Sequence, residues 1–231
     1  MLLNDLTNKQ IKEISSVIAP KLVNHPAFMF YYKNGKNREK FIEDYFNYFL
    51  HKWNKKELVF SNENHDIIIS LIDVNSYHSK DKGLGAAKLK KYKNPYANVS
   101  FHQGTVAYLT EIVAPANIET KIMTVYSTLN YADEVDKLVD EVTAIANENN
   151  FMIVYETFSK KSNEIMSKKG FETAYEKQFS GTQYFETVMT YYKNDMSEPV
   201  KLIESFKPIV ITDEPEENEE NNKSDENETS E

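Results

Sequence analysis

The net charge of this chain is confined to its C-terminal end, which limits how much of the chain can fold. Residues 212–231 contain ten acidic residues and one lysine, a net charge of −9. The whole chain of 231 residues has 27 basic and 36 acidic residues, again −9, so the first 211 residues are neutral overall. A segment this charged and this poor in apolar residues cannot form a core. We therefore predict one domain over residues 1–195, a linker or docking segment over 196–211 and a disordered acidic tail over 212–231.

The composition excludes several classes of protein. Cysteine is absent, so disulfides, a thiolate nucleophile and cysteine-ligated zinc are ruled out. Residues 1–12 lack a basic segment followed by an apolar one, and the longest apolar runs are too short to span a bilayer. Because residues 1–211 are neutral overall, a nucleic-acid partner is not expected. These features predict a soluble cytoplasmic protein without a membrane segment.

The histidines and the basic residues show no pattern of a metal or nucleotide site. The five histidines have no ligand spacing to one another, so we expect no metal site. They are His25, His51, His65, His78 and His102. The basic aromatic run at residues 88–93 could contact RNA or an acidic partner, but a solvated loop is the more frequent origin of such a run.

Two helices are predicted in the N-terminal part of the chain. Thr7 and Gln10 have the spacing of a capping box, and apolar residues follow at helical spacing until Pro20. Residues 38–53 carry a stripe of aromatic residues at helical spacing, which indicates a helix packed against the core.

Strand patterns dominate the middle of the sequence. Residues 57–60 and 66–73 flank a polar loop and predict a β-hairpin. Residues 75–98 are more charged, and we interpret them as a long excursion or lid. Residues 105–113, rich in β-branched and aromatic side chains, predict a strand, and residues 121–127 predict another.

The C-terminal part of the domain alternates helices and strands. Asn130 is placed to cap a third helix, and residues 151–155 form a short apolar run typical of a buried strand. Residues 162–169 predict a short helix, followed by a pair of strands at 171–179 and 182–192. The strand–helix–strand unit predicts a parallel crossover. The whole order predicts an α/β fold, with a mixed, mostly antiparallel sheet and helices on both faces.

One segment resembles a known family. Residues 156–172 contain a strand end Glu156-Thr157, a short helix with an asparagine, and Gly170-Phe171 before a terminal strand pair. This order resembles the C-terminal half of the N-acetyltransferase (GNAT) superfamily. Residues 108–115 are similar to the family's fourth strand, which ends in a comparable Val-x-Pro. The resemblance covers nearly all of residues 1–192 and implies an N-acetyltransferase-like fold.

The resemblance implies a cofactor and a set of site residues. Family members transfer an acetyl group from acetyl-CoA to an amine, and some use a carboxylate on the fourth strand as general base. Here Glu111 has that position, and alternation along a strand would place it on an apolar face that raises its pKa. A carboxylate that faces solvent or pairs with a lysine is the alternative, and Glu156 is a second, weaker candidate. The backbone of Ile112, Val113 and Ala114 would hold the pantetheine of acetyl-CoA. The family's cofactor-binding asparagine corresponds to Ser162, or to Asn163 if the register slips by one residue.

Two departures from the family pattern mark the chain as divergent. The family's pyrophosphate loop is rich in glycine, but no glycine occurs here between Gly104 and Gly170. The family's tyrosine, which protonates the departing thiolate, corresponds to Met166 when counted back from Gly170, leaving Tyr155 or Tyr175 as substitutes. We therefore expect weak or absent binding of acetyl-CoA.

Two functions follow from this comparison. The first is an acyltransferase that moves an acetyl group from acetyl-CoA to an amine of a small molecule or protein. The second is a non-catalytic, acetyltransferase-like binding or regulatory module that has lost the cofactor site. The sequence does not identify the acceptor.

Overall fold

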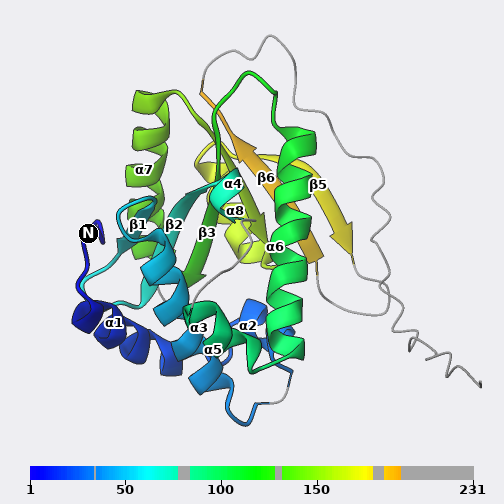
Figure 1. Ribbon diagram of the computed structural model, residues 1–231. Coiled ribbons are helices and arrows are strands. Elements are labelled where there is room, and N and C mark those ends of the chain that lie inside the picture. Colours follow the sequence, from blue (N-terminus) through cyan, green and yellow to red (C-terminus); the bar gives the residue numbers. More distant parts are fainter. Residues whose placement is uncertain (34, 78–83, 128–131, 179–184, 194–231) are drawn as a thin grey trace, which may run out of the picture.

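A computed structural model describes residues 1–33, 35–77, 84–127, 132–178 and 185–193 (Figure 1). The predicted linker at 196–211, the predicted tail at 212–231 and the helix-capping Asn130 lie outside the described residues. The helices are α1 (Asn8–Lys21), α2 (Pro26–Tyr31), α3 (Arg38–Trp53), α4 (Val74–Tyr77), α5 (Leu84–Lys90), α6 (Asn94–Val113), α7 (Ala132–Asn149) and α8 (Lys160–Lys168). The strands are β1 (Leu58–Ser61), β2 (Ile67–Asp73), β3 (Thr120–Ser127), β4 (Met152–Thr157), β5 (Glu172–Gln178) and β6 (Phe185–Tyr191).

The described strands form one six-stranded sheet in the order β1-β2-β3-β4-β6-β5. Only β3 and β4 run parallel, and α7 connects them, whereas the other neighbouring strands are antiparallel. The structure thus confirms the predicted mixed, mostly antiparallel sheet with a parallel crossover at its centre.

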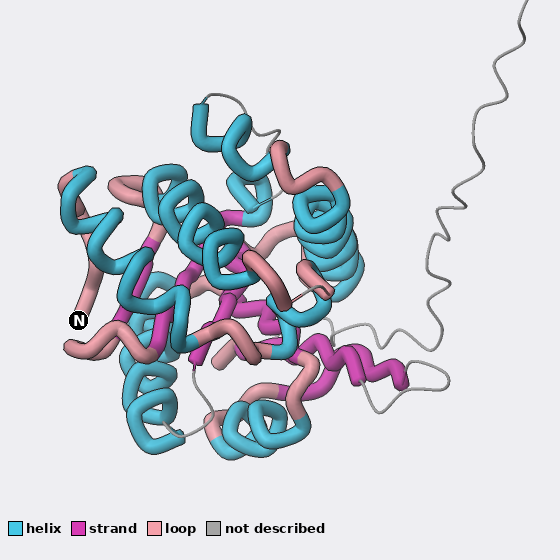
Figure 2. Tube along the Cα trace, turned by 90° about the horizontal axis from the view of Figure 1, so that it is seen from below, coloured by secondary structure: helices cyan, strands magenta, loops and turns pink. Residues whose placement is uncertain are grey.

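Helices cover both faces of the sheet (Figure 2). On one face, α7 and α8 pack over alternate residues of the central strands, such as Ile69, Met123 and Ile153. The other face carries α1, α2, α3 and α6 over the intervening residues, such as Ile68 and Ile122. Strand residues alternate between these two cores because successive side chains of a strand point to opposite faces.

Local signals in the sequence explain most element boundaries. The Thr7 hydroxyl accepts the Gln10 N–H and the Gln10 side chain accepts the Thr7 N–H, which completes the predicted capping box of α1. At the other end of the domain, Gly170 has φ +87°, a left-handed conformation that follows α8 and suits glycine. Within the described residues, no helix is long and apolar enough to cross a membrane.

The structure overturns the prediction for residues 105–113. This segment is the second half of the 20-residue helix α6 and not a strand. The preceding residues, predicted as a charged excursion, contribute α4, α5 and the first half of α6. Buried side chains recur along α6 at helical spacing, from Val99 through His102 and Val106 to Leu109 and Val113. The strand that lies beside β4 in parallel is β3, and not residues 105–113.

Candidate active site where two parallel strands separate

The central strands of the sheet diverge and leave a cavity between them. Pairing of β3 with β4 ends at Met123 and Tyr155, whereas β3 continues along β2 as far as Ser127. A cavity of about 100 Å³ lies at this point. It is lined by the ends of β3 and β4, by the start of α8, by α2 and by α6. The cavity therefore collects side chains from segments far apart in the sequence.

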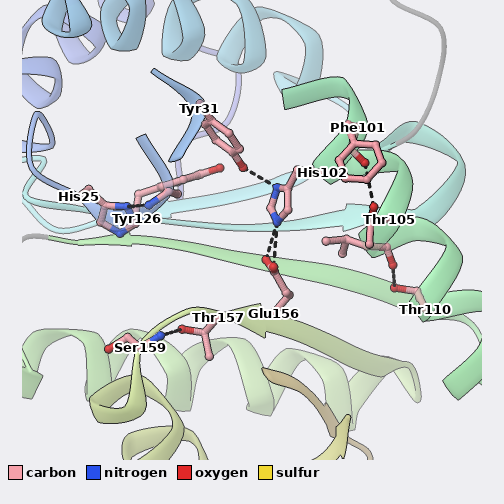
Figure 3. A network of polar contacts seen from close by, with 12 residues as sticks. His25, Tyr31, Phe101, His102, Thr105, Thr110, Tyr126, Glu156, Thr157 and Ser159 are labelled. Atoms are coloured by element: carbon pink, nitrogen blue, oxygen red, sulfur yellow. Dashed lines mark hydrogen bonds and ion pairs between the residues drawn. The ribbon is translucent and has the colours of Figure 1, made fainter. Parts of the chain in front are cut away.

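A buried histidine–carboxylate pair lines this cavity (Figure 3). His102 Nε2 lies 2.8 and 2.9 Å from the two carboxylate oxygens of Glu156, and both side chains are at most 9% exposed. His102 Nδ1 lies 2.5 Å from the Tyr31 hydroxyl. Both ring nitrogens are engaged, so Tyr31 and Glu156 hold the imidazole in one orientation. The three groups come from α2, α6 and β4.

A second carboxylate stands next to this pair. Glu156 lies opposite Val188 in the β4–β6 ladder, and Glu186 is two residues away from Val188 on the same face of β6. Burial and the charge of Glu156 raise the pKa of Glu186 to about 7, against smaller opposing effects of His102 and Lys177. Burial alone would lower the pKa of His102, but the charge and hydrogen bond of Glu156 and the charge of Glu186 outweigh it and raise that pKa. Glu186 of this cluster thus exchanges its proton near neutral pH, and the carboxylates beside His102 favour its protonated form.

An aromatic core holds the remaining walls of the cavity. Phe28 is fully buried, and its ring lies 5.4 Å from Tyr126 and 5.9 Å from Tyr31, both of which line the cavity. The Tyr126 hydroxyl lies 2.7 Å from that of Tyr45. His25 also lines the cavity, and burial lowers its pKa to about 4, so it is neutral at physiological pH. These contacts fix the shape of the site from α2, α3 and β3.

Comparisons with known proteins identify the fold. No protein-family model and no curated protein matches this chain. Among solved structures, a polyamine N-acetyltransferase of Drosophila melanogaster matches over 84% of this chain and 100% of its own, with 8% identity and a TM-score of 0.51. The C-terminal condensation domain of Ebony, in complex with β-alanyl-dopamine, covers 84% of this chain and 98% of its own, with 12% identity and a TM-score of 0.51. The chain has the N-acetyltransferase fold.

Within the N-acetyltransferase fold, the structure does not bring the predicted base to the cavity. Glu111 lies in the last turn of α6, and its side chain is exposed. The apolar face that would raise its pKa came from the predicted strand, which is wrong. Its role as general base stays a prediction without a buried environment to support it.

The residues predicted to hold the cofactor are divided between two places. Ile112 and Val113 end α6, and the N–H of Ala114 donates to the Thr110 carbonyl at 2.9 Å as the cap of that helix. The N–H of Ala114 is therefore engaged by the helix. Asn163 lies on α8, where its Nδ2 donates to Thr187 Oγ1 at 2.8 Å. Its buried Oδ1 has no hydrogen-bond partner among the described residues.

Met166 lies on α8, in the core that contains Tyr155 and Phe171. This core is on the α7 face of the sheet, whereas α6 with Glu111 covers the opposite face. Met166 and Glu111 therefore lie on opposite faces of the sheet. Tyr155, one of the two suggested substitutes for the family's tyrosine, lines the cavity and packs in the same core as Met166, whereas Tyr175 packs in the core beneath α6. Burial raises the pKa of Tyr155, so its hydroxyl stays protonated at neutral pH.

Sequence reasoning missed His102 and ranked Glu156 below Glu111. The signal for His102 was its place among the buried residues of α6, between Val99 and Val106. A polar residue on the buried face of a helix needs a partner, and here that partner is Glu156. No spacing rule connects these residues, because they are 54 positions apart.

The fold implies acetyl-CoA, and the residues around the cavity fit it only in part. The ends of β3 and β4 diverge at the cavity, which leaves strand edges beside which an amide-containing pantetheine arm could lie. The first turn of α7 carries Asp133 and Glu134. Carboxylates at a helix N-terminus take the place where a phosphate would be stabilised and repel it. Glu134 also accepts a hydrogen bond of 2.6 Å from Asn62. The diverging strand ends would suit the pantetheine arm, and the acidic first turn of α7 would oppose a pyrophosphate placed there.

Proposed function

We propose that this protein transfers an acyl group from a thioester to a primary amine, with Glu156 and His102 as its base. The observation that carries the proposal is the buried His102–Glu156 pair in the cavity where β3 and β4 separate. The two structural neighbours support it by their names, since one is a polyamine N-acetyltransferase and the other was solved with β-alanyl-dopamine. Acetyl-CoA is the reference donor, and it would supply the acyl group.

The residues of the cavity have distinct roles in this proposal. An amine must lose a proton to attack a carbonyl carbon, and the Glu156–His102 pair accepts that proton. Tyr31 orients His102 through Nδ1. On the other face of the sheet, the protonated hydroxyl of Tyr155 is available to donate a proton to the departing thiolate. Base and acid thus stand on opposite faces of the same strand, β4.

The acidic first turn of α7 predicts weak binding of acetyl-CoA. Charge-assisted hydrogen bonds to phosphate each contribute about 1.5–3 kcal/mol, so the loss of two or three weakens binding by about 3–6 kcal/mol. This difference changes a micromolar dissociation constant to roughly millimolar. The acyl group and the pantetheine arm would then provide most of the affinity.

The test is calorimetric titration with acetyl-CoA, followed by a thiol-release assay against a panel of primary amines. We expect binding near millimolar and amine-dependent thiol release. Comparing turnover of the variants Glu111→Gln and Glu156→Gln shows which of the two carboxylates is the base. Loss of turnover in Glu111→Gln, with full turnover in Glu156→Gln, would move the base to α6 and contradict our assignment.

The non-catalytic binding module remains the second candidate. The observation in its favour is the acidic first turn of α7, which opposes a pyrophosphate. No binding at millimolar acetyl-CoA, together with no thiol release for any amine, would support the non-catalytic module and contradict the acyltransferase.

The pH dependence of turnover should respond to Glu186. Turnover requires neutral His102, so kcat/KM should rise with pH through the His102 pKa. The charge of Glu186 helps to raise that pKa, so Glu186→Gln lowers the pKa and moves the rising limb to lower pH. The measurement is kcat/KM between pH 5.5 and 9. The control is Glu172→Gln, an exposed carboxylate on β5, which should leave the limb in place. A shift to higher pH in Glu186→Gln would contradict the arrangement.

A further inference from the structure

Aromatic side chains form part of the cavity wall. Tyr31, Tyr77 and Tyr126 line it and are at most 5% exposed, and Phe158 lines it from the loop after β4. The Phe158 ring lies 5.7 Å from the His102 ring and stacks at 6.2 Å on Phe30. Flat aromatic walls favour a flat or apolar ligand body, and their faces attract cations.

Phe30 extends the aromatic surface outward from the cavity. It lies on α2 next to Tyr31, with a ring separation of 5.9 Å, and is 45% exposed. Phe158 therefore connects an exposed ring to the buried histidine, as the ring separations above show. A ligand that enters past these rings meets aromatic surface before it meets the carboxylate of Glu156.

The ionisable groups at the cavity have a net negative charge. Among the described residues that line it, neither lysine nor arginine is present, and His25 is neutral at physiological pH. Glu156 lines the cavity, and Glu186 lies on the neighbouring strand β6, on the same face of the sheet. His102 is the one lining group that gains positive charge, and Glu156 balances that charge. Above pH 7 two carboxylates face a single imidazole, so the cluster is negative overall.

We propose that the cavity binds a small primary amine as its ammonium ion, with a flat apolar body and without a carboxylate. The ammonium group lies against Glu156, and the body lies against Tyr31, Tyr126 and Phe158. A carboxylate or phosphate on the ligand would meet the same negative cluster, with neither lysine nor arginine among the described lining residues to pair with it. The inference rests on the proposed function only in naming this amine as the acyl acceptor, because binding itself needs no donor.

Three compounds with the same phenyl body show how much the ammonium group and a carboxylate each change the affinity. The probe is 2-phenylethylamine; 2-phenylethanol replaces the ammonium group with a hydroxyl, and phenylalanine adds a carboxylate. Calorimetric titration of the full chain at pH 8 keeps the amine protonated and the carboxylates ionised. We expect 2-phenylethylamine to bind at least about tenfold more tightly than either of the others, because unpaired or like charges oppose binding.

Two variants test whether Glu156 binds the ammonium group. Glu156→Gln should weaken 2-phenylethylamine at least about tenfold and leave 2-phenylethanol nearly unchanged. Glu172→Gln, on the exposed side of β5, should change neither. If Glu156→Gln fails to fold, as judged by circular dichroism, the ratios of the three dissociation constants for the unaltered protein still test the proposal.

The outcomes distinguish this inference from the proposed function. Phenylalanine or 2-phenylethanol binding as tightly as 2-phenylethylamine would overturn the inference, as would no binding of the amine. Selective amine binding without thiol release would support the inference and count against the proposed function. Turnover of amines with no preference against a carboxylate would support the function and overturn the inference.

Discussion

Replacement of Glu156 by glutamine is expected to lower kcat/KM for acetyl transfer by about 10²–10⁴-fold, the usual contribution of a positioned base. Glutamine keeps the size of the side chain and its hydrogen bond to His102, but it cannot accept a proton. The Glu156 carboxylate lies 2.8 Å from His102 Nε2 and lines the cavity. The measurement is initial-rate thiol release across a range of amine concentrations, with circular dichroism to confirm folding.

The division between kcat and KM makes this prediction specific. If Glu156 removes the proton only in the transition state, kcat falls along with kcat/KM. An increase in KM alone would show that Glu156 binds the ammonium ion without acting as the base. Glu156→Asp is the matched variant, because it keeps the carboxylate and moves it by one methylene, and it should recover part of kcat. Turnover of Glu156→Gln within twofold of the unaltered protein would contradict the assignment.

Much of the fold was predictable because its boundaries have local causes. The capping box at Thr7 and the aromatic stripe of residues 38–53 define α1 and α3. Polar residues between two apolar runs define the hairpin of β1 and β2. The Gly170 stop and the terminal strand pair define the end of the domain. Each signal acts within a few residues, so a single sequence carries it.

The error at α6 has a physical explanation. Its outer face carries Phe101 and Tyr108, which are 41% and 52% exposed, where an amphipathic helix usually has polar residues. With apolar residues on both faces, the helical periodicity is hidden, and β-branched residues such as Thr105 and Val106 favour a strand by composition. The packing of α6 on the sheet decides its conformation, and that contact is not visible in the sequence.

The candidate site was less predictable than the fold for a related reason. Glu156 and Asn163 were named because they lie within the segment that resembles the family. His102 and Tyr31 come from helices whose arrangement over β4 brings them together. Each pairing joins residues more than 50 positions apart, and without the folded chain no spacing rule relates them.

The largest effect on stability is expected for Phe28→Ala. Phe28 is fully buried and its ring contacts those of Tyr31, Tyr45 and Tyr126 at 5.2–5.9 Å. Removal of a buried phenylalanine ring costs about 3–5 kcal/mol of unfolding free energy, through lost transfer energy and the cavity it leaves. The measurement is denaturant unfolding of the full chain. Phe28→Leu keeps an apolar side chain in that space and should cost clearly less, and a loss below about 1.5 kcal/mol in Phe28→Ala would contradict this packing.

Phe28→Ala also tests whether the aromatic core shapes the site. Two of the rings that Phe28 supports, Tyr31 and Tyr126, line the cavity, and Tyr31 orients His102. Because a misplacement of about 1 Å can cost up to roughly 10²-fold in rate, turnover should fall even where the variant is fully folded. Phe49→Ala is the matched control, since Phe49 is equally buried but packs against Tyr45, Tyr48 and Trp53, outside the cavity lining. Equal losses of turnover in the two folded variants would show that α2 does not position the histidine, and that stability alone accounts for the effect.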